Sequence, residues 1–207
     1  MGRTIATVLA VVFGFASSAH AAFFNNGSGL TGTYQTITFD EFPLANFEPV
    51  INQYGFLGVS FSGAHAAVGN MPDPNQTGVR ITNYASPASN DPPPVIIRFA
   101  NEVTQADIAL LTLDGPTTFQ ARLRGVLVES ATARTFFLNP INFYGFRGIA
   151  FDELMISRNI GPASNGMTLD NLQFTSAVPE PQAWLLMLAG WGALAVRRRR
   201  SAITLTR

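Results

Sequence analysis

Hydrophobic and polar residues alternate over short stretches in the middle of this chain, and turn-forming residues separate the stretches. In Phe119–Arg124 the apolar Phe119, Ala121 and Leu123 occupy every second position, which is the period of a strand with one buried face. Gly125 then breaks the period and predicts a bulge or bend inside one long strand. The pattern predicts strands over Gln35–Phe42, Gly58–Ser62, Val79–Asn83, Val95–Phe99, Ala106–Asp114, Thr118–Glu129, Ala133–Leu138, Gly148–Ser157 and Thr168–Thr175.

The fold class follows from the same pattern. No stretch of the domain from residue 22 to residue 177 keeps the 3.6-residue period of an amphipathic helix. Many short strands joined by turns are typical of an all-β, antiparallel β-sandwich or jelly roll. Two loops rich in proline, asparagine and glycine lie between Asn70 and Pro94. Loops at one end of a sandwich often bind ligands, and solvated connections are the alternative interpretation.

The first 21 residues have the pattern of a secretory signal peptide. Arg3 precedes the apolar run Ile5–Phe15, and Ala19-His20-Ala21 forms a small-x-small cleavage site before Ala22. We therefore expect a signal helix that the Sec translocon reads and that signal peptidase removes.

Residues 178–207 form a second address segment. Prolines on both sides of Glu180 keep the backbone extended. The uncharged run Ala183–Val196 suits a helix in lipid, although it is short beside the roughly 20 residues of a usual span. Trp184 fits an interfacial anchor, and the arginines at 197–200 fit a stop on the cytoplasmic side. The pattern predicts a transmembrane helix over about 183–196.

This order of elements closely resembles the PEP-CTERM sorting signal of Gram-negative bacteria. The family's tripeptide matches Pro179, Glu180 and Pro181, and its basic end matches Arg197, Arg198, Arg199 and Arg200. The resemblance implies recognition by an exosortase, a membrane-embedded cysteine transpeptidase thought to cleave near the tripeptide. It also implies an inner-membrane precursor that is passed on to the cell envelope or exterior. The tail Ser201–Arg207 departs from the family, and an ordinary C-terminal anchor is the alternative.

Composition limits the partners of the domain between the two address segments. The chain has no cysteine, so its stability does not come from disulfides. Six of its 13 basic residues and one of its 13 acidic residues, Glu180, lie in the address segments. The domain therefore keeps seven arginines against twelve carboxylates, a net charge of about −5. Such a domain is a poor partner for nucleic acid or anionic lipid, whereas divalent cations and neutral glycans suit it better.

Candidate chemistry is sparse. His65 is the only histidine of the domain, it follows a predicted strand in a predicted loop, and no Gly-x-Ser-x-Gly motif is present. Catalysis by a nucleophile and zinc binding are therefore both disfavoured. Asp40 and Glu41 close the first predicted strand, and Asp170 lies in the last. Since first and last strands often meet in jelly rolls, these three carboxylates are the candidate ligands of a structural calcium ion. Surface carboxylates or turn caps are the alternative.

Three stretches loosely resemble the β-sandwich ectodomains common among PEP-CTERM proteins, namely Ile37–Phe42, Tyr54–Ser62 and Leu169–Phe174. Those ectodomains are similar to lectin-like or galactose-binding-like folds. We expect an exported, non-enzymatic protein of the cell surface or extracellular matrix with a structural or adhesive role, in contact with extracellular polysaccharide. The alternatives are a secreted glycoside hydrolase that uses two carboxylates and a calcium-dependent glycan-binding module.

Overall fold

The computed structural model describes residues 22–176, except residues 70, 87–90 and 162–163. The predicted signal peptide, the tripeptide at 179–181, the apolar run at 183–196 and the arginines at 197–200 lie outside the described residues. Within them, the regular elements are β-strands and a short 3₁₀ turn, η1 (Gly55–Leu57). All strand pairs are antiparallel, which confirms the predicted all-β antiparallel class.

Across the part of the chain that the structure describes, no helix has the length and apolarity needed to cross a membrane. The strands in chain order are β1 (Ala22–Asn26), β2 (Gln35–Ile37), β3 (Val59–Ser62), β4 (His65–Val68), β5 (Val79–Thr82), β6 (Val95–Thr112), β7 (Gly115–Leu123), β8 (Val126–Thr135), β9 (Phe143–Ser157) and β10 (Met167–Ser176). They form one sheet in the order β4-β5-β10-β6-β9-β7-β8, with β1 on β9, β2 on β10 and β3 on β6.

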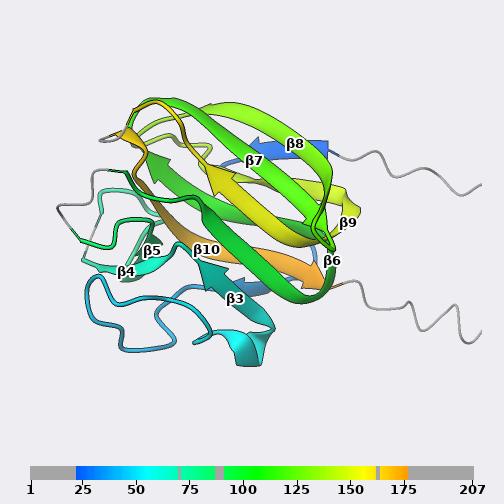
Figure 1. Cartoon of the computed structure of the whole chain (residues 1–207), viewed down its shortest axis with the longest axis horizontal. Coiled ribbons are helices and arrows are strands. Elements are labelled where there is room, and N and C mark those ends of the chain that lie inside the picture. The colour runs from blue at the N-terminus through cyan, green and yellow to red at the C-terminus, as the bar shows by residue number, and fades with distance from the viewer. Residues whose placement is uncertain (1–21, 70, 87–90, 162–163, 177–207) are drawn as a thin grey trace, which may run out of the picture.

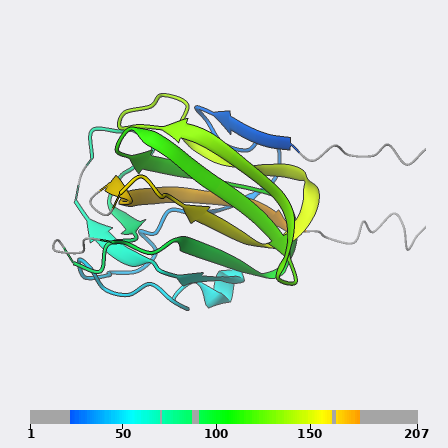
Figure 2. The same ribbon diagram turned by 45° about the horizontal axis from the view of Figure 1, so that its top comes forward.

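Two long strands, β6 and β9, fold this sheet into two layers (Figures 1 and 2). Their pairing is interrupted between Arg98 and Val103, and Gly148 of β9 has a φ of 75° near the same level. On one side of the interruption β6 and β9 pair with β10 and β1, and on the other side with β3 and β7. Strands that change layer at a bend are a known way to close a sandwich corner.

Aromatic side chains fill the space between the layers. Phe119 of β7 stacks on Tyr144 of β9 with ring centroids 5.2 Å apart, and Phe23 of β1 covers both rings. A second aromatic group joins Tyr54 to Phe39 and Phe61 by edge contacts. Because these residues come from six different segments, the core ties the two layers together along their whole length.

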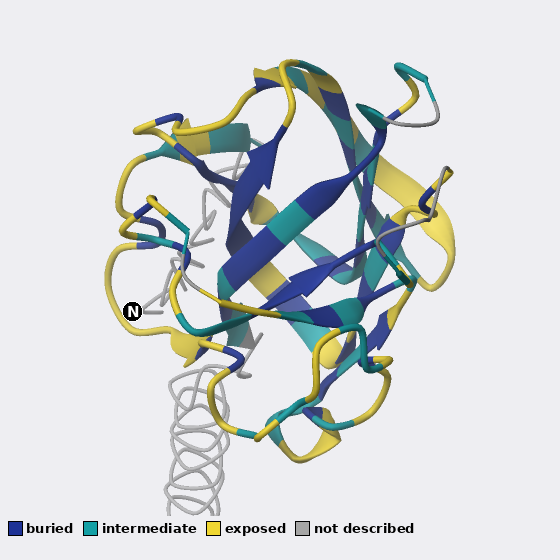
Figure 3. Cartoon of the chain, turned by 90° about the vertical axis from the view of Figure 1, so that its left-hand side faces the viewer, coloured by how far each residue is buried: buried dark blue, intermediate teal, exposed yellow. Residues whose placement is uncertain are grey.

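The two ends of the molecule differ. Ala22 pairs with Arg147, Arg147 with Gln105, and Gln105 with Thr175, so the first and last described strands share one row of the sheet. We call this end, where the chain enters at Ala22 and leaves at Ser176, the terminal end (Figure 1). The opposite end, where β6 and β8 finish and β7 begins, carries most of the long connections, and we call it the loop end. Figure 3 looks onto the loop end and shows exposed loops around buried strands.

Several predicted strands have different limits in the structure. The predicted strand Thr118–Glu129 is a hairpin, because Arg124 and Gly125 both have positive φ and form its two-residue turn. The predicted strand Ala133–Leu138 is wrong, since β8 ends at Thr135 and Leu138 has a φ of 58°. The first predicted strand ends at Ile37, because Phe39 has a φ of 63°.

Other differences concern where strands begin, whether two predicted strands are joined, and which strands were not predicted. The two predicted strands Val95–Phe99 and Ala106–Asp114 are one strand, β6. β9 begins at Phe143, five residues before its prediction. β1 and β4 were not predicted from the alternation pattern, and His65 lies in β4 instead of a loop.

Polar side chains attach two loops to the outer face of the layer that contains β10. The amide nitrogen of Leu30 donates to the side chain of Gln173 at 2.7 Å, and the side chain of Gln76 donates to the carbonyl of Ala109 at 3.1 Å. Asn142 donates to Asp73 at 2.9 Å. Each bond satisfies a buried polar group and holds a loop that has few apolar side chains of its own.

Asp107 lies under these loops without a partner. It is 0% exposed, and neither carboxyl oxygen has a hydrogen-bond partner. Its neighbours across the sheet are Gly145 and Gln173, and a Cβ at residue 145 would meet the backbone of Ala106 and Asp107. Burial raises the pKa of the Asp107 carboxyl from 3.8 to about 8.

We expect the domain to lose stability as pH rises. Because the pKa of Asp107 is raised to about 8, the folded chain holds a proton between about pH 4 and 8 that the unfolded chain releases. The contribution of the protonated Asp107 carboxyl to folding stability is complete below about pH 4 and absent above about pH 8. Asp107→Asn should therefore raise Tm by several degrees at pH 8.5 and little at pH 4.5, since 1 kcal/mol corresponds to roughly 2–4 °C in a domain of this size.

Thermal melting between pH 4 and 9 measures this effect. Glu129→Gln on the edge strand β8 is the matched control and should keep the pH dependence of the wild type. Parallel Tm curves for the wild type and Asp107→Asn would contradict the assignment.

Candidate functional site

A hollow opens at the loop end between the turn after β6 and the segment after β8. It has a volume of about 540 Å³ and is lined by Leu113, Asp114, Arg134, Phe136 and Phe137. Phe136 and Phe137 are 39% and 45% exposed. Adjacent exposed aromatic residues in a hollow are uncommon on a surface without a binding role. The hollow is therefore the strongest candidate for a ligand site among the described residues.

A second hollow of about 270 Å³ adjoins the first, because Leu113 and Phe137 line both. Met71 comes to it from the first of the two loops predicted as candidates for binding, and Tyr84 comes from just before the second, at 86–94. The ring of Tyr84 lies directly over Gly166, where a Cβ would overlap the ring atoms. Glycine at 166 is thus needed for this position of Tyr84.

Asp114 and Arg134 place a planar polar pair beside the aromatic rings. The Nε and Nη2 atoms of Arg134 donate to the two carboxyl oxygens of Asp114 at 2.7 and 2.5 Å. The hydrogen bond from Arg134 lowers the pKa of Asp114. Both side chains are largely exposed, so the pair adds little to folding stability. Asp114 also accepts a backbone hydrogen bond from Gly115, and the exposed pair keeps further N–H groups and oxygen lone pairs that can bind hydroxyl groups of a ligand.

A buried arginine supports the walls of the hollow. Arg158 donates to the hydroxyls of Thr117 and Thr135 at 3.2 and 3.0 Å and to the carbonyl of Leu113 at 2.7 Å. These bonds connect the end of β6, the start of β7 and the end of β8. Burial lowers the pKa of Arg158, and nearby Tyr84 and Asp114 oppose that shift. The rim of the hollow is consequently held by a rigid network.

The chemistry of this arrangement suits a ligand with both apolar and hydroxyl-bearing surfaces. Aromatic rings offer flat apolar faces, and the Asp114–Arg134 pair offers donors and acceptors in one plane. Binding sites generally combine an apolar lining with a few placed polar groups in this way. Sugar rings carry C–H faces and hydroxyl edges and match both requirements.

The predicted cation ligands lie elsewhere, beside the start of β5. Asp40 accepts the amide of Val79 at 2.7 Å, and Asp170 accepts the amide of Thr77 at 2.9 Å. Glu41 accepts the amide and hydroxyl of Thr38. The structure thus brings Asp40 and Asp170 to one segment, as pairing of β2 with β10 requires, and Glu41 caps its own turn.

These contacts assign a structural role to the three carboxylates. Asp170 is almost fully buried, and its other oxygen accepts the amide of Asn171 at 2.7 Å. Burial raises the pKa of Asp170 to about 7, and the bonds from Thr77 and Asn171 oppose the shift. No group of three or more histidine, cysteine or acidic residues within the described ranges is placed to hold a metal ion. The calcium site stays a prediction. All three carboxylates that would bind the ion already accept hydrogen bonds from backbone N–H groups.

Sequence reasoning missed two partners of these carboxylates. Arg80 is buried nearby and interacts electrostatically with Asp170 and Asp40, while burial itself lowers its pKa. The hydroxyl of Tyr54 donates to the carbonyl of Phe39 at 3.0 Å, and burial is the main reason that its pKa is raised. Both residues looked like ordinary strand and turn residues in the sequence.

Three titratable groups with shifted pKa values, Asp107, Asp170 and His65, are buried or half-buried in the fold. Asp107 and Asp170 have the raised pKa values of general acids, but both are enclosed by the fold. Burial lowers the pKa of His65, and its Nδ1 atom is buried without a hydrogen-bond partner. A glycosidase needs two carboxyls that reach the substrate, and these two do not.

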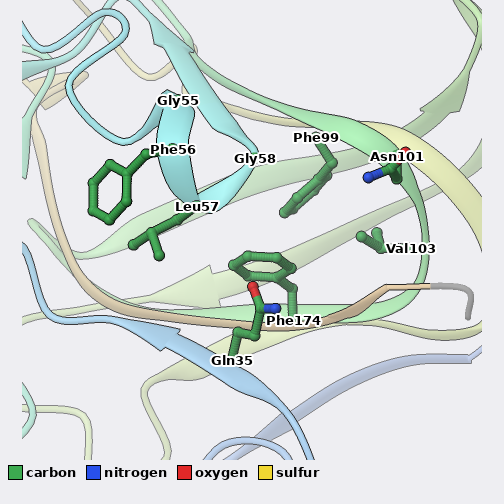
Figure 4. A pocket seen from close by; sticks show the side chains of 9 residues that line it. All are labelled: Gln35, Gly55, Phe56, Leu57, Gly58, Phe99, Asn101, Val103 and Phe174. Carbon is green, nitrogen blue, oxygen red and sulfur yellow. The ribbon is translucent and has the colours of Figure 1, made fainter.

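A further hollow, shown in Figure 4, lies toward the terminal end. The rings of Phe99 and Phe174 pack 5.2 Å apart there. Leu57 of η1 also lines it, and Gln35 and Asn101 contribute amide groups. With no charged side chain among its lining residues, this hollow offers less chemistry than the one at the loop end.

The candidate residues at the loop end were absent from the sequence prediction. Asp114 and Arg134 are brought together by the hairpin register, in which Gly115 pairs with Thr135. A signal was present in the adjacent pair Phe136-Phe137, but the alternation placed it inside a strand that in fact ends at Thr135.

The sequence matches no protein-family model, and no curated protein matches it either. The assignment of this site consequently rests on the geometry of the chain itself.

We expect Asp170→Ala to lower Tm by several degrees, with or without added calcium. The substitution leaves the part-buried amides of Thr77 and Asn171 without their acceptors, at a cost below the roughly 1–3 kcal/mol of a fully buried donor left unpaired. Melting curves with calcium and with chelator measure the effect. A calcium-dependent rise in Tm for the wild type that is lost in Asp170→Ala would instead support the cation site.

Proposed function

We propose that this chain is an exported, non-enzymatic protein of the cell envelope or extracellular matrix that holds polysaccharide at its loop end. Its role is structural or adhesive. An exosortase recognises Pro179, Glu180 and Pro181 in an inner-membrane precursor and passes the domain outward. The two-layered antiparallel sheet fits a lectin-like or galactose-binding-like sandwich, which is the finer form of the fold expected from the ectodomain resemblance.

The observation that carries the proposal is the pairing of aromatic faces with a planar ion pair in one exposed hollow. Phe136 and Phe137 line it with aromatic rings, and Asp114 and Arg134 line it with hydrogen-bonding groups. The net charge of the domain, about −5, favours a neutral glycan over an anionic one. A site on loops that a rigid scaffold positions is the usual place for such recognition.

The position of the hollow agrees with the predicted route of export. The described chain leaves at Ser176 in the terminal end, and the hollow lies at the loop end. A domain that is held through residues beyond Ser176 therefore presents the hollow away from its attachment. Polysaccharide outside the cell can then reach the aromatic rings without steric hindrance from the membrane.

We expect Phe137→Ala to weaken binding of the full-length protein to polysaccharide by roughly two- to tenfold. Loss of one aromatic contact of roughly 0.5–1.5 kcal/mol corresponds to this factor. Affinity electrophoresis in gels that contain neutral glucans, neutral galactans or polysaccharide extracted from the host matrix measures the change. A reducing-sugar assay on the same polysaccharides tests for turnover.

Tyr34→Ala is the matched control, because Tyr34 is an exposed aromatic residue that lines none of the hollows described above. Equal weakening by both substitutions, or no binding by the wild type, would contradict the glycan proposal. Turnover by the wild type would support the hydrolase alternative.

Replacement of Pro179, Glu180 and Pro181 by alanine tests the sorting proposal. In the native host we expect the wild type to lose its C-terminal segment and leave the inner membrane, whereas the triple variant keeps both its full mass and its membrane location. Intact mass and cell fractionation are the measurements. If both proteins keep the C-terminus in the inner membrane, the segment is a plain anchor.

A further inference from the structure

The tip of the β7–β8 hairpin is apolar and exposed. Val126, Leu127 and Val128 are 69%, 50% and 41% exposed and follow directly after the turn at Arg124 and Gly125. β8 is an edge strand that pairs only with β7, so no other described strand covers them. Three consecutive exposed apolar residues at a hairpin tip cost solubility unless another surface covers them.

The tip lies at the terminal end, close to the point where the described chain stops. Ser176 pairs with Val103, and Val103 pairs with Phe151. The next residue, Asp152, accepts the amide of Arg124 at 3.0 Å. Three contacts between neighbouring strands therefore connect Ser176 to the hairpin turn.

The chain beyond Ser176 limits how far the tip can be from a membrane. The apolar run begins at Ala183, so seven residue steps separate it from Ser176. Even a fully extended chain spans only about 25 Å over that number of steps. If the apolar run lies in a bilayer, the terminal end must remain near the lipid headgroups.

Charge differs between the two ends of the domain. The terminal end has four arginines, at positions 98, 122, 124 and 147, against the carboxylates of Glu102, Glu129, Asp152 and Glu153, for a net charge of about 0. The other three arginines and eight carboxylates give the rest of the domain a net charge of about −5. An anionic membrane surface therefore repels the rest of the domain and leaves the terminal end free to approach.

Arg124 places a positive charge next to the apolar tip. Its side chain is 80% exposed, and its Nη2 atom forms a salt bridge with Glu102 at 2.8 Å. Arginine beside exposed valine and leucine is the composition of segments that lie in the membrane interface. The long side chain can keep its guanidinium at the phosphates while the neighbouring apolar groups reach deeper.

We propose that the hairpin tip, residues 124–128, lies in the headgroup region of the membrane that holds the precursor. This inference rests on the proposed anchoring through the C-terminal segment and adds a second contact with lipid. The contact orients the domain so that its loop end faces away from the bilayer. It also keeps residues 179–181 close to the membrane, where a membrane-embedded enzyme can reach them.

Fluorescence from a single labelled position tests the proposal. The chain has no cysteine, so Leu127→Cys gives a unique site for an environment-sensitive fluorophore such as NBD. The full chain is reconstituted in vesicles of phosphatidylethanolamine and phosphatidylglycerol, with and without spin-labelled headgroups. The matched control is Thr132→Cys, an exposed position on the same strand. We expect blue-shifted emission and severalfold stronger quenching by spin-labelled lipid at 127 than at 132.

The outcomes separate this inference from the sorting proposal. Equal, weak quenching at both positions of a chain that floats with the vesicles overturns the tip contact alone. Energy transfer between labelled copies without lipid quenching also overturns it and assigns the tip to a second copy of the chain. A chain that does not float with the vesicles overturns both the anchoring and the tip contact. Melting curves of both labelled variants establish that they fold as the wild type does.

Discussion

The structure depends on the continuous antiparallel pairing of β6 with β9 through a bend. These strands are the only described pair that contributes to both layers, and every other described strand attaches to one of them directly or through one or two intervening strands. At the bend, backbone N–H and C=O groups lose their partners in the sheet. The gap between Arg98 and Val103 lies at the terminal end, where water can form hydrogen bonds with such groups. The positions of both ends of the molecule follow from this single constraint.

Polar side chains hold several loops of this domain against the sheet, where apolar packing usually does so. The loops over β10 are short of large apolar residues, and Gln76, Asn142 and Gln173 hold them by hydrogen bonds to the sheet. Asp40 and Asp170 do the same for the approach to β5. A chain without disulfides obtains rigid loops by this means. Asp107 is the exception, because its carboxyl is enclosed by the same loops and has no partner.

The parts of the fold that were predictable are those in which one strand has one buried face. Phe119 and Ala121 are fully buried, as the alternation predicts, and the all-β class is confirmed. β6 was predicted as two strands because residues 100–105, which join them, are mostly exposed or half-buried and carry little apolar alternation. The hairpin turn was missed because Arg124 occupies a position that usually holds asparagine or glycine.

The candidate site was less predictable than the fold. Asp114 and Arg134 are 20 residues apart and meet only because β7 and β8 have one particular register. Asp40 follows β2, which pairs with the strand of Asp170, so the two carboxylates approach each other as expected. The sequence did not indicate that Thr77 and Val79, just before and at the start of β5, would bind them. Pair contacts across a sheet depend on register, and register follows from the whole set of strands.

The direction of β10 has a mechanical consequence. Its last residue leads to the segment that we propose attaches the domain, and its first residues line the second hollow, which adjoins the one that contains the Asp114–Arg134 pair. Tension between a bound polymer and the attachment point would therefore run along β10. Its hydrogen bonds to β6 lie across that direction, so they would carry the load together in shear and would not open one after another. Such a strand resists sustained flow better than one that is pulled from its edge.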